Sequence, residues 1–225
     1  MKRDVARARA AIERLGITLV YPPANEREPP SLWYELHPRT RMQWSWDADA
    51  DPRVAELWHL RNELSASGDV AYGKWFRGRA TFFSLDVFHA MLGRIAATAD
   101  PLRGLSPEAR EILDLCRERS PISTKQLRAD AGLQGKPFEG TFQRAMKQLW
   151  TRLLVVGTGE IEDGAFPSLA VAATELMFED VWAARAEVPA VAGARLDAAL
   201  GRTPAFARAF TQGLQALTAP LTVEA

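Results

Sequence analysis

Cysteine is nearly absent from the sequence, because Cys116 is the only one among 225 residues. A single thiol cannot form an intrachain disulfide, and it cannot supply a cysteine-rich metal site. Cys116 lies on the apolar face of a predicted helix, and unpaired cysteine is among the residue types most often found in protein interiors. The sequence therefore predicts a buried structural thiol rather than a reactive one.

Histidine and the common catalytic motifs are also scarce. His37, His59 and His89 are far apart, and none occurs in a His-Glu-x-x-His or comparable metal-ligand spacing. The sequence lacks the Gly-x-x-x-x-Gly-Lys-Ser/Thr phosphate loop and the Gly-x-Ser-x-Gly motif of hydrolases. We therefore predict no metal ion and no cofactor, and nucleotide hydrolysis is disfavoured.

Long apolar runs are missing as well. No stretch of about 18 apolar residues occurs, which is the length that a membrane-spanning helix needs. The sequence begins with Met1-Lys2-Arg3-Asp4 and continues into an arginine- and alanine-rich segment without the apolar region of a signal peptide. The expectation is a cytoplasmic protein that does not interact with membranes.

The chain has no net charge, since 28 basic residues balance 28 acidic ones. The distribution is uneven, because residues 119–155 hold seven basic and two acidic residues, a net charge of +5. A local basic face can attract DNA even in a neutral protein. The alternative is that these charges only solvate the outer face of a helix pair.

The segment from Ser106 to Ala173 has the element order of a winged helix-turn-helix. Ser106-Pro107-Glu108 is typical of a helix start, and Ser123 with Gln126 three residues later has the spacing of a capping box. A third helix opening at Pro137 is expected to carry an inward stripe of Phe138, Phe142, Ala145, Met146, Leu149 and Leu153. Two short apolar segments, 154–156 and 169–171, are separated by glycines and predict a β-wing. This order of elements favours nucleic-acid binding.

The remaining segments predict helices over 2–15, 53–64 and 84–97, a short strand at 17–21 and a β-hairpin at 72–83. Trp33, Tyr34, Trp44 and Trp46 are expected to pack on the second of these helices. We therefore expect a mainly α protein with small β elements, a winged helix-turn-helix flanked by an N-terminal α/β lobe and C-terminal helices. The expected domains are an N-terminal lobe (1–103), the winged helix (104–173) and a helical extension (174–225).

The extension is predicted to hold one helix that starts at Thr174 and two more that are separated near Thr203 and Pro204. The last of them has an apolar stripe at spacings of four, four and three residues, namely Phe206, Phe210, Leu214 and Leu217. This stripe provides either a homodimer interface or a packing surface within its own chain.

Two groups of residues are candidates for contacting DNA. The exposed side of the third helix and its flanks offer Lys125, Lys136, Thr141, Gln143, Arg144, Lys147, Gln148 and Arg152, which suit base edges and phosphates. In the 72–83 hairpin, cations alternate with aromatic residues, and the candidates there are Lys74, Arg77 and Arg79. The acidic residues Glu160, Glu162 and Asp163 argue against a wing that contacts DNA. A core hairpin with a solvated turn is the alternative to a DNA-contacting one.

Two segments, Leu57-Trp58-His59-Leu60-Arg61-Asn62-Glu63-Leu64 and residues 72–84, followed by the winged helix, resemble short bacterial AlkZ-related proteins. Those proteins are similar to part of the winged-helix DNA glycosylases that unhook alkylated or crosslinked bases. The resemblance implies DNA binding in a repair setting. The glycosylases position water with a Gln-x-Gln or Gln-x-Asp motif, whereas Gln43 here is followed by Trp44 and Ser45. We therefore expect a non-catalytic DNA-binding protein, with a DNA glycosylase and a protein-interaction module without DNA affinity as the alternatives.

Overall fold

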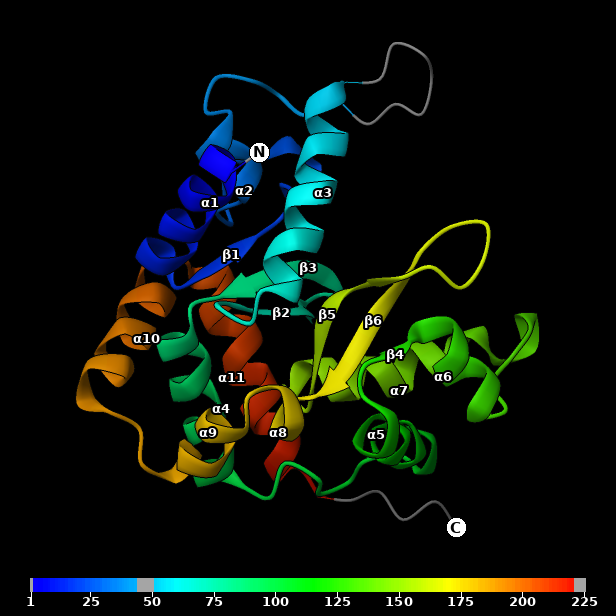
Figure 1. Ribbon diagram of the computed structural model, residues 1–225. Coiled ribbons are helices and arrows are strands. Elements are labelled where there is room, and N and C mark those ends of the chain that lie inside the picture. Colours follow the sequence, from blue (N-terminus) through cyan, green and yellow to red (C-terminus); the bar gives the residue numbers. More distant parts are fainter. Residues whose placement is uncertain (1, 44–50, 221–225) are drawn as a thin grey trace.

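The computed structural model describes residues 2–43 and 51–220, and these form helices around two three-stranded antiparallel sheets (Figure 1). The predicted fold class, mainly α with small β elements, is confirmed. Trp44 and Trp46 lie outside the described residues, so their predicted packing stays a prediction. Trp33 is fully buried and packs in one cluster with Leu57 and Leu60, as predicted.

The first sheet has the strand order β1-β3-β2 and is covered by helices on both faces. This part of the chain contains, in sequence order, α1 (Lys2–Leu15), β1 (Ile17–Leu19), η1 (Pro23–Asn25), α2 (Leu32–Leu36), α3 (Pro52–Ala66), β2 (Ala71–Phe76), β3 (Arg79–Phe83) and α4 (Leu85–Thr98). In Figure 1, α1, α2 and α3 lie above this sheet and α4 lies below it. Successive strand residues point to opposite faces, so Phe82 packs with α3 whereas Phe83 packs with α4.

The second sheet, of order β4-β6-β5, lies in the 106–173 segment together with the helices predicted there. The elements are α5 (Pro107–Arg119), β4 (Ile122–Ser123), α6 (Thr124–Asp130), η2 (Lys136–Phe138), α7 (Glu139–Thr151), β5 (Val155–Ile161) and β6 (Ser168–Ala173). Ser106 Oγ accepts a hydrogen bond from Ala109 N at 3.2 Å, and Ser123 Oγ accepts one from Gln126 N at 3.0 Å. Both predicted N-caps are confirmed, because each serine satisfies an amide that the first helical turn leaves free.

Two details of this segment differ from the prediction. The side chain of Gln126 donates to Asp130 at 2.7 Å instead of returning to Ser123, so only one half of the capping box forms. Helix α7 begins at Glu139, because Pro137 lies in the preceding 3₁₀ turn. Phe138 therefore does not belong to the inward stripe, and its side chain is 45% exposed.

Cys116 is fully buried on the inner face of α5. Desolvation by the surrounding apolar side chains raises the pKa of its thiol to about 12. Because the thiolate is the nucleophilic form of cysteine, this thiol is unreactive near neutral pH. The predicted structural role of Cys116 is confirmed.

The C-terminal helices return to the first sheet and close its lower face (Figure 1). They are α8 (Thr174–Met177), α9 (Glu179–Ala183), η3 (Ala184–Ala186), α10 (Ala190–Arg202) and α11 (Pro204–Thr218). The single helix predicted from Thr174 is wrong, because Phe178 leaves the helical conformation (φ −127°, ψ 55°) and packs against Phe88. No helix in the described ranges is long and apolar enough to cross a membrane.

The apolar stripe of α11 packs within the chain. Phe206 and Phe210 are at most 4% exposed, and their rings lie 5.9 and 6.5 Å from that of Trp75 in β2. Leu217 is buried and Leu214 partly buried in the same cluster. Of the two uses predicted for this stripe, the structure has the intrachain one.

Candidate nucleic-acid interface

A groove with a volume of about 740 Å³ lies between α7, the turn of the β2–β3 hairpin and α11. It brings together candidates from both predicted groups, namely Lys74, Arg77, Gln143, Lys147, Gln148 and Arg152. These residues are up to 78 positions apart in the sequence. The hairpin and the third helix, treated as separate candidates in the sequence, thus line one surface.

Among the residues that the structure describes, the charge of this groove is of one sign. Its lining there includes five cationic residues and no carboxylate, and the cations are Lys74, Arg77, Lys147, Arg152 and Arg208. The sequence patterns did not identify Arg208 as a candidate DNA-contacting residue. It lies on α11 between the buried positions Phe206 and Phe210, so its place on the polar side of the predicted last helix was a usable signal. None of the described acidic residues lines this surface, although the sequence contains 28 acidic residues in all.

The close approach of α7 to the hairpin depends on Gly73. A Cβ at this position would lie 3.2 Å from the ring of Trp150, which is 5% exposed on α7. The hairpin turns through Arg77 and Gly78, both with positive φ (53° and 73°), which suits the twist of a two-residue turn. The guanidinium of Arg77 lies 5.2 Å from the ring of Phe76, and Arg77 and Gly78 of the turn both line the groove.

Two cations of the groove, Lys74 and Arg152, have no ion-pair partner among the described residues. Arg152 donates from Nη1 to the carbonyl oxygens of Pro101 and Arg103, at 2.9 and 2.6 Å, and desolvation and the charge of Arg110 lower its pKa. Desolvation also lowers the pKa of Lys74, with Arg61 and Arg128 adding to the effect. No ion pair involving either side chain occurs in the described part of the chain. A bound anion would favour the charged form of both groups.

The other predicted residues have different surroundings. Lys125 donates to the carbonyl oxygen of Asp163, and Gln148 Oε1 accepts from Ser106 N at 3.0 Å, so both hold the local fold. Arg144 is exposed on α7 and donates to Thr141 Oγ1 at 3.1 Å. Lys136 and Arg79 are exposed but do not line the groove.

The acidic residues of the β5–β6 hairpin are largely paired inside the molecule. Glu160 forms an ion pair with Arg61 of α3 and accepts a hydrogen bond from Trp58 Nε1 at 3.3 Å. Asp163 accepts hydrogen bonds from Ser123 and Ser168, and these lower its pKa. Of the three acidic residues that argued against a DNA-contacting wing, Glu162 is the exposed one.

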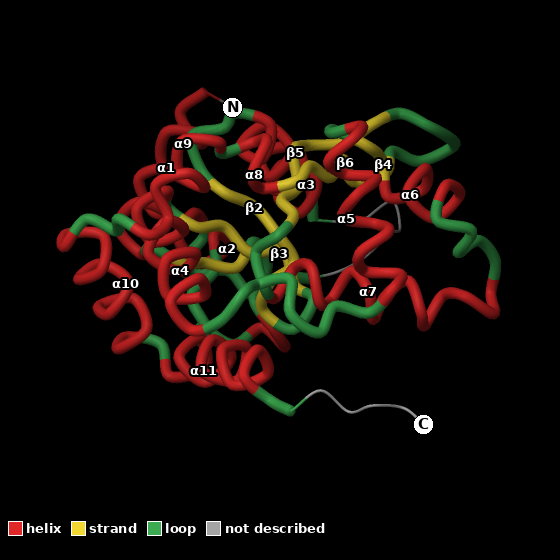
Figure 2. Tube along the Cα trace, turned by 90° about the horizontal axis from the view of Figure 1, so that it is seen from below, coloured by secondary structure: helices red, strands yellow, loops and turns green. Residues whose placement is uncertain are grey.

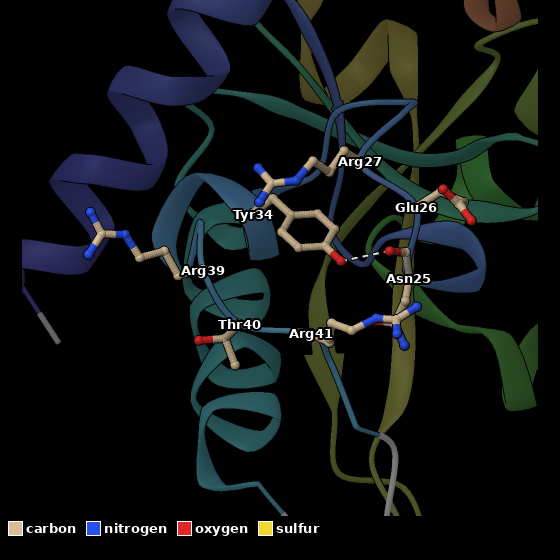
Figure 3. Close-up of a pocket in the computed structure, with 7 residues that line it drawn as sticks. All are labelled: Asn25, Glu26, Arg27, Tyr34, Arg39, Thr40 and Arg41. Atoms are coloured by element: carbon tan, nitrogen blue, oxygen red, sulfur yellow. Dashed lines mark hydrogen bonds between the residues drawn. The ribbon is translucent and has the colours of Figure 1, made fainter.

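A second, smaller pocket of about 340 Å³ lies beside Tyr34, between the loops that precede and follow α2 (Figure 3). It contains Arg27, Arg39 and Arg41, but Figure 3 shows the guanidinium groups of Arg39 and Arg41 pointing to opposite sides of the Tyr34 ring. Arg27 is held by the carbonyl oxygen of Pro38 at 2.6 Å. The arginine side chains of this pocket do not point toward a common centre, so the pocket lacks the geometry of an anion site.

Within residues 2–43 and 51–220, no group of three or more histidine, cysteine or acidic residues is arranged to hold a metal ion. The groove is the surface on which six of the eleven predicted site residues meet.

Comparison with known proteins gives one family. The model of a family described as AlkZ related matches residues 3–201. Neither the curated proteins nor the solved structures include a match. Because the matched range spans most of the sequence, the chain belongs to the AlkZ-related family.

Proposed function

We propose that this chain is a DNA-binding protein of DNA repair or the damage response, and that it acts without catalysis. The observation that carries the proposal is the groove, in which five cations and, within the described ranges, no carboxylate line one concave surface. Phosphates attract such a surface strongly, and counterion release supplies most of the affinity for nucleic acid. Membership of the AlkZ-related family supports the repair setting.

In this proposal, residues 104–173 form a winged helix-turn-helix, with α7 as its recognition helix. The element order α5-β4-α6-α7-β5-β6 and the antiparallel β4-β6-β5 sheet support this assignment. Residues 134–140, at the N-terminal end of α7, are all exposed, and this end of a recognition helix is the one that contacts base edges. The flanking segments, 1–103 and 174–225, would supply the hairpin and α11.

The double substitution Arg144→Ala/Lys147→Ala tests the proposal. Both side chains are exposed on α7, and alanine favours helix, so the fold is expected to survive. The slope of log affinity against log salt should fall by about one for each cation that contacts a phosphate. Fluorescence anisotropy with labelled duplex, single-stranded and branched DNA at several salt concentrations measures it.

Arg3→Ala is the matched control, since it removes an exposed cation from α1, which does not line the groove. Its affinity and salt slope should equal those of the unmodified protein. Absence of binding to every DNA form at low salt would contradict the proposal and favour a protein-interaction module.

The non-catalytic part of the proposal has a separate test. The sequence contains no Gln-x-Gln or Gln-x-Asp, the motif that resemblance to the glycosylases would require. Incubation of the protein with alkylated duplex DNA is therefore expected to yield no abasic sites, as measured by alkaline cleavage of the strand. Release of the alkylated base above the level of a protein-free sample would establish a glycosylase instead.

A further inference from the structure

We infer that the groove between α7 and α11 accepts a single strand of DNA rather than a duplex. This inference rests on the proposed DNA binding and names the substrate form. It follows from the position of α11, which makes the middle and end of α7 one wall of a concave surface. Figure 2, seen from below, shows α7 and α11 on the same side of the molecule.

A helix that reads duplex DNA must stand clear of its neighbours. The major groove of B-DNA is about 12 Å wide, and a helix with its side chains is about 10–12 Å across, so a second helix alongside cannot enter with it. Gln143, Lys147 and Thr151 of α7 share the groove with Arg208 and Gln212 of α11. This face of α7 is therefore one wall of the groove, and a duplex would meet the exposed residues outside the lining, namely Arg144 and residues 134–140.

The wall formed by α11 suits an extended strand. Apart from Arg208 and Gln212, the α11 residues that line the groove are small, namely Ala205, Ala209, Gly213 and Ala216. They leave room along the helix, while Arg208 lines the groove from α11 and Lys147 and Arg152 line it from α7 and its C-terminal end. A phosphodiester backbone lying in the groove would thus meet cations from the hairpin, from α7 and from α11. A duplex is too wide to lie between α7 and α11, so it would not have cations on both sides of one strand.

Recognition in this groove is expected to be independent of base sequence. Trp75 and Trp150 are the aromatic residues of the lining, and they are only 4% and 5% exposed, so their ring faces are already covered by protein. Stacking on exposed aromatic rings is what gives many single-strand binders their base contacts. Here the cations carry the interaction.

The affinities of two variants, Arg208→Ala and Arg144→Ala, distinguish binding of a single strand in the groove from binding of a duplex. Arg208 is exposed on α11, whereas Arg144 is exposed on α7 outside the groove lining. For a 12-nucleotide oligothymidylate, Arg208→Ala should lower affinity about fivefold at 0.1 M salt and reduce the salt slope by about 0.7. The affinity for a 12-base-pair duplex should not change with Arg208→Ala and should fall with Arg144→Ala.

The outcomes distinguish this inference from the function on which it rests. Tighter binding of the strand than of the duplex, with the loss confined to the strand in Arg208→Ala, supports the inference. Strand affinity that Arg208→Ala does not alter, or stronger binding of the duplex, would overturn it while leaving DNA binding in place. Absence of binding to both probes at low salt would overturn the proposed function itself. Circular dichroism of each variant establishes that the fold is intact.

Discussion

Glutamine in place of Glu160 is expected to lower the free energy of unfolding by about 3–5 kcal/mol, the usual cost of breaking a buried ion pair by removing one partner. The side chains of Arg61 and Glu160 are only 8% and 10% exposed. Arg61 also donates to the hydroxyl of Tyr72 at 3.4 Å, and its guanidinium lies 4.3 Å from the ring of Trp58. Without the carboxylate, a guanidinium that cannot release its proton would stay buried among these rings.

Urea denaturation followed by tryptophan fluorescence measures this loss, and Glu162→Gln is the matched control. Glu162 lies two residues further along the chain and is exposed, so the same chemical change should alter stability by less than about 0.5 kcal/mol. A double variant, Arg61→Met/Glu160→Leu, should recover much of the stability, because apolar pairs often replace buried ion pairs without loss. Equal effects of the two glutamine substitutions would show that the pair is not buried in solution.

Phe206→Ala is expected to cost about 3–5 kcal/mol, as large-to-small substitutions of buried aromatic residues do. Phe206 is 1% exposed, and its ring lies 5.0 Å from that of Phe76 at an interplanar angle of 82°, an edge-to-face arrangement. The substitution would leave a cavity where α11 meets β2. The same denaturation experiment measures it.

Phe166→Ala is the control for Phe206→Ala. Phe166 is 85% exposed, so truncating it should change stability by less than about 0.5 kcal/mol. If α11 served mainly as a dimer interface, the stability of the unmodified protein would rise with protein concentration, and Phe206→Ala would abolish that rise. The packing of Phe206 on the hairpin predicts a midpoint that does not depend on concentration.

Sequence patterns predicted the local structure of this chain well because their causes are local. The serine caps at Ser106 and Ser123, the helix over residues 2–15 and the apolar stripe from Phe206 to Leu217 all follow from residues within a few turns of each other. The errors were local too, since Pro137 can open either an α-helix or a 3₁₀ turn.

The groove could not be predicted in the same way. Lys74, Lys147 and Arg208 come from three distant segments, and nothing in their spacing shows that they meet. The partners of Gln148 and Glu160 were equally hidden, because Ser106 N and Arg61 reach them only through tertiary packing. Sequence patterns identified four of the five cations in the groove, all except Arg208, whereas only the folded chain shows which of them share a surface.

The largest apolar cluster joins two walls of the groove, because it contains Trp75 and Phe76 of the hairpin and Phe206 and Phe210 of α11. The third wall, α7, packs in a second apolar cluster and meets the hairpin where Trp150 lies against Gly73. The walls of the groove are thus fixed to one another before any ligand binds. The protein therefore loses little conformational entropy when a strand binds in the groove. Association should then approach the rate set by electrostatic attraction, with a small heat-capacity change, as for a ligand that meets a site already formed.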